Sequence, residues 1–170
     1  GYQNRPDIFA LNIRRPDLLY NEVIEVDERL DAAGEVVHPL DEVSVRNRLQ
    51  SAYDAGFRSV AIALMHAFQN PAHEAAVAAV AHDIGFTQVS TSSEASPLIK
   101  LIGRGDTAVA DAYLSPILRR YVAQVSDALG SDRGGCRQLL FMQSNGGLTD
   151  ANFFAGKDAI LSGPAGGVVG

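Results

Sequence analysis

The sequence predicts a mixed α/β fold in which helices cross over between the strands of a sheet. Residues 59–65 are apolar nearly throughout, which is typical of a strand buried on both faces. A helix is expected over residues 70–83, and residues 87–91 form a second strand candidate. Because a strand, a helix and a strand follow one another, this succession favours a mixed or parallel sheet with helical crossovers.

A hairpin and a helix are expected before the first of these strands. Residues 22–27 alternate between apolar and polar side chains and the extended pattern resumes after Gly34, so residues 20–38 predict a β-hairpin. Asp41 is a suitable N-cap for the helix that follows, and Gly56 ends that helix. The apolar residues of this helix have helical spacing: Val45, Leu49, Ala52 and Tyr53.

The crossover helix has clear start and stop signals. Asn70 is expected to cap it, with Pro71 in the first helical position, where a missing N–H is tolerated. An alanine-rich run then extends to about Asp83, and Gly85 ends the helix.

A long helix is expected in the second half of the chain. It covers residues 106–129 and ends at Gly130. Pro116 kinks a single long helix, or it begins a shorter helix that Ser115 caps; we favour the single kinked helix. A domain boundary is expected near residue 100. The apolar stripe of this helix consists of Leu114, Ile117, Leu118, Tyr121, Val125 and Leu129.

The last nine residues, 162–170, read Ser-Gly-Pro-Ala-Gly-Gly-Val-Val-Gly and follow the apolar residues 159–161. A strand that runs into such a loop is typical of a phosphate-binding site, because glycine lets backbone N–H groups approach an anion closely. The alternative is a flexible, glycine-rich tail, and composition alone does not separate the two.

A second glycine-bearing turn favours the phosphate site. Residues 137–142 are a buried-strand candidate, after the turn signal at residues 134–135, and lead directly into residues 143–147, Gln-Ser-Asn-Gly-Gly. Asn-Gly between two strands is also the commonest hairpin signal. Residues 148–154, however, resemble a short helix more than a returning strand, so we prefer two strand-to-loop units of a nucleotide site.

A metal site is considered at His66, His73 and Glu74, which flank the end of a strand and the start of a helix. Their spacing matches no familiar zinc pattern. His73 is expected to be an exposed residue of the first helical turn, and we predict no metal site.

Composition excludes several classes of protein. The 170 residues are 46% apolar and 20% charged, so a folded core is expected rather than disorder. The net charge of −6 argues against nucleic acid or an anionic membrane as partner, and no apolar stretch is long enough to span a bilayer. Cys136 is the only cysteine, which rules out an internal disulfide and favours a reducing, cytoplasmic compartment.

In combination, the two glycine segments resemble the hydantoinase A / 5-oxoprolinase family. Residues 142–148 and 161–170 look like the start of its ATP-binding core. The resemblance covers essentially the whole chain, and its further segments are residues 1–9, 26–29, 70–74, 92–97 and 104–116.

This resemblance implies a partial actin-like (ribonuclease H-like) ATPase fold in two parts. Residues 1–100 would be the C-terminal part of the family's N-terminal domain, and residues 101–170 the truncated start of its ATP-binding domain. The family's first phosphate loop, of the Asp-x-Gly-Gly-Thr type, has no counterpart here. The chain therefore resembles an internal part of a longer enzyme, and we expect it not to hydrolyse ATP on its own.

For the parent enzyme, the resemblance implies ATP-dependent opening of a cyclic amide or imide, such as 5-oxoproline or a hydantoin. Phosphorylation of the carbonyl oxygen would create a leaving group that water can displace. Mg²⁺ would neutralise the phosphates. A hydantoinase B-type subunit is a possible partner. A related ATP-dependent ketone carboxylase and a non-catalytic binding module are the alternatives.

The same resemblance supplies candidate site residues but no catalytic residue. On the substrate side they are Ser92, Ser93, Glu94, Arg104 and Thr107; residues 92–94 could equally be a helix cap or a turn. The ATP-binding candidates are Gln143, Ser144, Asn145, Gly146 and Gly147 in the first glycine segment, and Ser162, Gly163, Pro164, Ala165, Gly166 and Gly167 in the second.

Overall fold

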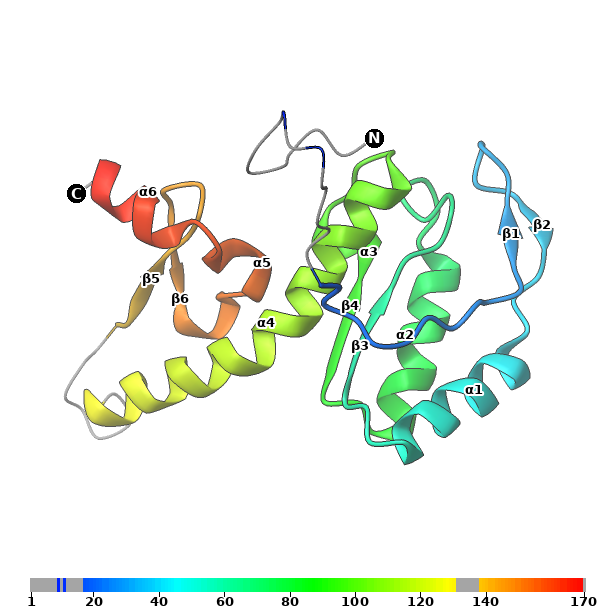
Figure 1. Ribbon diagram of the computed structural model, residues 1–170, viewed down its shortest axis with the longest axis horizontal. Helices are drawn as coiled ribbons and strands as arrows, with labels where there is room; N and C mark the ends of the chain where they lie inside the picture. The colour runs from blue at the N-terminus through cyan, green and yellow to red at the C-terminus, as the bar shows by residue number, and fades with distance from the viewer. Residues whose placement is uncertain (1–8, 10, 12–16, 131–137, 170) are drawn as a thin grey trace.

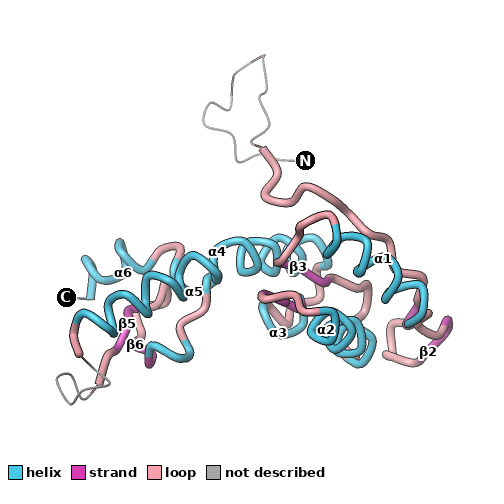
Figure 2. The backbone as a smooth tube through the Cα atoms, turned by 90° about the horizontal axis from the view of Figure 1, so that it is seen from below, coloured by secondary structure: helices cyan, strands magenta, loops and turns pink. Residues whose placement is uncertain are grey.

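A computed structural model describes residues 9, 11, 17–130 and 138–169, which form two small α/β units joined by one long helix, α4 (Figure 1). Figure 2 shows α4 running from the first unit to the second. The expectations for residues 1–8, 134–137 and Gly170, Cys136 included, lie outside the described part of the chain. No described helix combines the length and the apolar character needed to cross a bilayer.

The predicted N-terminal hairpin is confirmed but is shorter than expected. β1 (Arg29–Leu30) and β2 (Val36–His38) pair antiparallel around the turn at Gly34, whose φ is +86°. Residues 22–27 form no strand. Instead, Ile24 and Val26 pack against the core, and the carbonyl of Glu25 accepts a hydrogen bond from Arg48.

The capped helix is confirmed as α1 (Glu42–Asp54). The carboxylate of Asp41 accepts a hydrogen bond from the amide of Ser44 at 3.0 Å, which satisfies one of the orphan donors of the first turn. Three of the four predicted apolar residues, Val45, Leu49 and Ala52, are buried. They pack on the second helix of this unit.

The parallel crossover is also confirmed. β3 (Ser59–Ile62) and β4 (Gln88–Thr91) pair parallel, and α2 (Ala72–Ile84) connects them. α2 begins one residue later than expected, because Pro71 is its N-cap rather than its first helical residue. The side-chain oxygen of Asn70 accepts a hydrogen bond from the amide of Ala72 at 3.0 Å, and Gly85 ends α2 at a φ of +111°. The expected uniform burial of residues 59–65 is wrong, because the strand ends at Ile62 and Met65 is 40% exposed.

α3 (Ser92–Ala95) follows β4 directly, and α4 (Leu101–Ala128) is the single long helix that we favoured, with Pro116 inside it. Its buried face was predicted wrongly. None of the residues in the expected apolar stripe is buried, and Ile117 and Tyr121 are 50% and 56% exposed. Small and polar residues form the buried face instead: Arg104, Ala108, Asp111, Ala112 and Ser115.

The second unit begins with a hairpin, which corrects the preferred strand-to-loop interpretation. β5 (Leu140–Met142) and β6 (Leu148–Asp150) pair antiparallel, and Gly146 has a φ of +83° in the turn. The short helix expected after the turn is present only as the 3-10 helix η2 (Ala151–Phe153). Asn-Gly therefore acts here as a hairpin signal.

The second glycine segment is a helix rather than a loop. Residues 159–161, which were expected to form a strand, do not do so: Ala159 ends the short helix α5 (Gly156–Ala159), and residues 160–161 form a turn. Helix α6 (Ser162–Val169) follows. Pro164 is tolerated because the first-turn amides of a helix have no acceptor within it. Packing against β5 stabilises a helix that glycine alone would disfavour.

We predict that Ile62→Ala lowers the free energy of unfolding by about 2 to 5 kcal/mol, since Ile62 is 5% exposed in the core between α1, α2 and the sheet. A denaturant melt measures the change. Val43→Ala is the control, because Val43 is 73% exposed and its loss should cost less than about 0.5 kcal/mol. A loss below about 1 kcal/mol for Ile62→Ala would contradict the core described here.

Candidate functional site

Two buried charges meet where β3 and β4 end. Glu74 lies on α2 and Arg104 on α4, and each is 0% exposed. Ser92, also 0% exposed, lies between them at the start of α3. Ligand sites of α/β proteins commonly lie at the carboxyl ends of parallel strands, so this is the part of the first unit where a site is expected.

Both carboxylate oxygens of Glu74 are used inside the protein. Oε1 accepts hydrogen bonds from the amide of Leu64 at 2.9 Å and from the hydroxyl of Ser92 at 2.5 Å. Oε2 accepts from the amide and the hydroxyl of Ser93, at 2.9 and 2.7 Å. Four donors therefore compensate the burial of this charge.

Arg104 also bonds to the chain that follows β3 and to the start of α3. Its Nη2 donates to the carbonyls of Leu64 and Met65 at 2.9 and 3.0 Å, and its Nη1 donates to the hydroxyl of Ser92 at 3.2 Å. The Nε of Arg104 is buried without a partner. Glu74, Ser92 and Arg104, which we call the Glu74–Arg104 cluster, thus fix the chain after β3 to the start of α3.

The five residues expected on the substrate side differ in how accessible their side chains are. The side chains of Ser92 and Arg104 face the interior, so neither is placed to contact a substrate. The hydroxyl of Thr107 donates to the carbonyl of Gly103 within α4 at 2.9 Å. Ser93 is half-buried and bonded to Glu74, and only Glu94 of this group is exposed.

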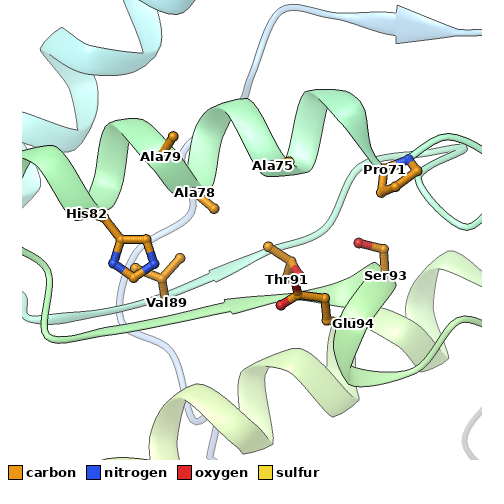
Figure 3. Close-up of a pocket in the computed structure, with 9 residues that line it drawn as sticks. All are labelled: Pro71, Ala75, Ala78, Ala79, His82, Val89, Thr91, Ser93 and Glu94. Atoms are coloured by element: carbon orange, nitrogen blue, oxygen red, sulfur yellow. The ribbon is translucent and has the colours of Figure 1, made fainter.

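Ser93 and Glu94 line an open groove of about 490 Å³ beside β4. Figure 3 shows Ala75, Ala78 and His82 of α2 on one side of it and the strand residues opposite. Apolar side chains such as Ala78 and Val89 line the groove together with polar ones, among them Thr91 and Glu94. The groove could take a small apolar group.

Both histidines considered for metal binding have protein partners. The Nδ1 of His66 donates to the carbonyl of Leu30 at 2.7 Å. The Nδ1 of His73 donates to the carboxylate of Glu28 at 2.7 Å, and its side chain is only 12% exposed, so the expectation of an exposed His73 is wrong. Within the described residues, no three His, Cys, Asp or Glu side chains are grouped as metal ligands.

The two glycine segments lie side by side in the second unit, although neither is the loop that was expected. The hydroxyl of Ser144 accepts a hydrogen bond from the amide of Leu161 at 3.0 Å, and both its amide and its hydroxyl donate to the carbonyl of Asp158 at 2.7 Å. Residues 143–147 are closed by hydrogen bonds between Gln143 and Gly147 and between Gly146 and Gln143. Ser144 thus attaches the hairpin turn to the start of α6.

Helix α6 leaves open space at its first turn. A Cβ built on Gly163 would meet nothing within 4 Å, whereas one on Gly146 would lie 3.0 Å from Val169. The first amides of a helix lack acceptors within it and carry a partial positive charge. The start of α6 is therefore the part of the glycine segments with both room and donors for an anion. Gly166 lies in the helix without a positive φ.

Sequence reasoning missed the structural roles of Glu74, Asp111, Ser115 and Gly156. A signal for two of them existed, because Arg104, Asp111 and Ser115 recur at helical spacing together with Ala108 and Ala112. Polar residues aligned with small ones on a long helix indicate a buried polar face. Gly156 carried no signal, since its role depends on a helix 41 residues away.

Two family models match the chain. One, described as the hydantoinase/oxoprolinase N-terminal region, matches residues 1–85, and one described as hydantoinase/oxoprolinase matches residues 104–170.

Individual proteins agree with these matches. A 5-oxoprolinase of Saccharomyces cerevisiae is 41% identical over 100% of this chain, which spans 15% of that protein. The crystal structure of an ATP-dependent caprolactamase from Pseudomonas jessenii matches 92% of this chain and 24% of its own, at 28% identity and a TM-score of 0.74. A nucleotide-free acetone carboxylase, from work on ATP-dependent acetone carboxylation, matches 84% of this chain and 21% of its own, at 27% identity and a TM-score of 0.73.

We predict that Arg104→Met destabilises the chain by about 3 to 5 kcal/mol, because it removes three hydrogen bonds and leaves the carbonyls of Leu64 and Met65 without these donors. A denaturant melt measures this loss. Arg119→Met, on the exposed side of the same helix, is the matched control and should change stability by less than about 0.5 kcal/mol. Equal effects of the two variants would show that the Glu74–Arg104 cluster contributes no specific stability.

Proposed function

We propose, from the premise that this chain belongs to the hydantoinase/oxoprolinase family, that it is part of a longer enzyme which uses ATP to open a cyclic amide. The chain spans about 15% of the length of the curated 5-oxoprolinase that it matches, so the activity concerns the whole enzyme. The observation that carries the proposal is the contact between the hairpin turn and the start of α6. These two glycine segments are the ones expected, from the resemblance to the family, to bind ATP.

The names of the relatives support the choice of a cyclic amide. 5-Oxoproline and caprolactam are both cyclic amides, and the caprolactamase is ATP-dependent by name. Amides are poor electrophiles, and transfer of the γ-phosphoryl group from ATP to the carbonyl oxygen, with ADP leaving, activates the carbonyl carbon. Water then adds to that carbon and the ring C–N bond breaks as the nitrogen takes up a proton. Hydrolysis of the resulting acyl phosphate releases phosphate and leaves a carboxylate. The share of this chain in that reaction would be to position the nucleotide.

ATP would bind with its phosphates at the first turn of α6. The amides of Ser162 and Gly163 are suitable donors, and the open space at Gly163 leaves room for an anion. The hairpin turn, from Gln143 to Gly147, would form the adjoining wall. Ser144 acts indirectly in this arrangement, because its hydroxyl is engaged with Asp158 and Leu161.

Mg²⁺ suits this site as a partner of the phosphates. It keeps several waters and binds through one or two carboxylates and the substrate phosphates, so it needs no cluster of protein ligands. The Asp158 carboxylate, paired with Lys157 at 3.2 Å, is the acidic group nearest in sequence to α6. When bound, the metal would neutralise phosphate charge.

The finer parts of the proposal follow from the family. They are an actin-like arrangement of the complete enzyme, a domain boundary near residue 100, a hydantoinase B-type partner subunit and a cytoplasmic location. Ser93 and Glu94 are kept as candidates for contact with a small molecule, because they line the groove beside β4.

A ketone carboxylase is the second candidate, and the likeness to acetone carboxylase favours it. The two are separated by ATP hydrolysis in the full-length enzyme. Stimulation by 5-oxoproline or a hydantoin supports the amidohydrolase, and stimulation by acetone with bicarbonate supports the carboxylase. Stimulation by neither would contradict both.

We predict that Gly163→Val weakens the binding of a non-hydrolysable ATP analogue to the full-length enzyme by about tenfold or more. Its side chain would fill the space at the start of α6 without meeting any protein atom within 4 Å of the Cβ, so the fold should persist. Isothermal titration measures the affinity, and a thermal melt measures the fold.

Gly103→Val is the matched control, since Gly103 also lies in the first turn of a helix with nothing within 4 Å of an added Cβ. It should leave the affinity unchanged. An unchanged affinity in a folded Gly163→Val variant would remove α6 from the nucleotide site.

A further inference from the structure

A second buried polar group on α4 lies at the junction of the two units. Asp111 and Ser115 are one helical turn apart and are 9% and 6% exposed. The Oδ2 of Asp111 accepts a hydrogen bond from Ser90 of β4 at 2.6 Å, and Ser90 in turn accepts from Gln88 at 2.8 Å. This carboxylate oxygen thus faces the first unit.

The other carboxylate oxygen faces the second unit. The Oδ1 of Asp111 accepts from the amide of Lys157 at 3.1 Å and from the hydroxyl of Ser115 at 3.0 Å. The hydroxyl of Ser115 accepts from the amide of Gly156 at 3.0 Å. The Asp111 carboxylate therefore connects β4 to α5, directly through the amide of Lys157 and through Ser115 to the amide of Gly156.

Close packing of α5 on α4 at Gly156 fixes the distance between these two helices. A Cβ on Gly156 would lie 2.7 Å from the amide nitrogen of Ser115 and 2.9 Å from the Cβ of Leu114. The backbone of α5 consequently rests directly on α4, and no larger residue fits without moving one helix from the other.

From α5 the attachment continues to the glycine segments. The carbonyl of Asp158, next to Lys157, accepts both hydrogen bonds from Ser144 in the hairpin turn. Ser144 accepts the amide of Leu161, which precedes α6. A displacement of α5 would therefore move the turn and the start of α6 together.

We infer that Asp111 is a positioning residue of the nucleotide site, which holds the hairpin turn and α6 in a fixed place relative to β4. This inference rests on the proposed function. Asp111 does not touch the nucleotide itself; it acts through α5. A buried carboxylate that accepts three hydrogen bonds defines geometry more sharply than an apolar contact of the same size, because each bond requires its own distance and direction.

The test compares Asp111→Asn with Ile62→Ala in the full-length enzyme. The first variant keeps the shape of the side chain but replaces one of its two acceptor oxygens with an NH₂ group. That group cannot accept the hydrogen bonds that the Asp111 carboxylate receives from its three donors. The second destabilises the core of the first unit and leaves the contacts of α5 intact. For both, the affinity for a non-hydrolysable ATP analogue, the melting temperature and hydrogen exchange of residues 140–163 are measured.

We expect Asp111→Asn to weaken the binding of the ATP analogue by about tenfold. Hydrogen exchange should become faster in residues 140–163 but not in residues 59–62. Ile62→Ala should lower the melting temperature with unchanged affinity. If Asp111→Asn does not fold, Ser115→Ala decides, with an expected weakening of roughly threefold.

Unchanged affinity in the folded Asp111→Asn variant, or in Ser115→Ala where that variant decides, would overturn the inference. So would an equal loss of affinity in Ile62→Ala, because Asp111 would then act through general stability alone. Absence of nucleotide binding by the unmodified enzyme would overturn the proposed function, and this inference with it.

Discussion

The polar face of α4 is the constraint on which the rest of the structure depends. Arg104 and Asp111 are buried charges seven residues apart on this helix. Arg104 donates hydrogen bonds and Asp111 accepts them, and their partners lie in different parts of the chain. Arg104 fixes the segment after β3, and Asp111 connects β4 to α5. Burial of a charge costs several kcal/mol unless it is hydrogen-bonded or paired, so each of these side chains requires its partners in the folded protein.

This arrangement explains why small and polar residues, rather than larger apolar ones, form the buried face of α4. Alanines between the buried polar residues let the helix approach the sheet and α5 closely, so that short side chains such as Ser92 and Ser115 reach their partners. Ile117 and Tyr121 are correspondingly exposed, and the ring of Tyr121 contacts that of Phe141 in β5. One helix, α4, contacts both small units.

For function, the division of roles between the two units is informative. The first unit presents a groove lined by Ser93 and Glu94, while its buried charges are occupied with structure. The second presents the start of α6 beside the hairpin turn, attached through Ser144. Under the proposed function, the nucleotide would be bound by backbone amides on short elements, whose position depends on α4 rather than on the strength of the hairpin itself.

The sequence by itself determined the local elements with strong signals: the cap at Asp41, the helix end at Gly85, the parallel crossover, the single helix through Pro116 and the family. It also located Ser92, Ser93 and Glu94 at the end of a strand. Only the tertiary structure decided that residues 162–169 are helical, that residues 143–147 close a hairpin, and that Arg104 and Ser92 face inward. The reason is physical. Glycine permits several backbone conformations, and contacts between residues far apart in sequence select among them; likewise, whether a polar side chain is buried depends on partners such as Glu74, which no local pattern reveals.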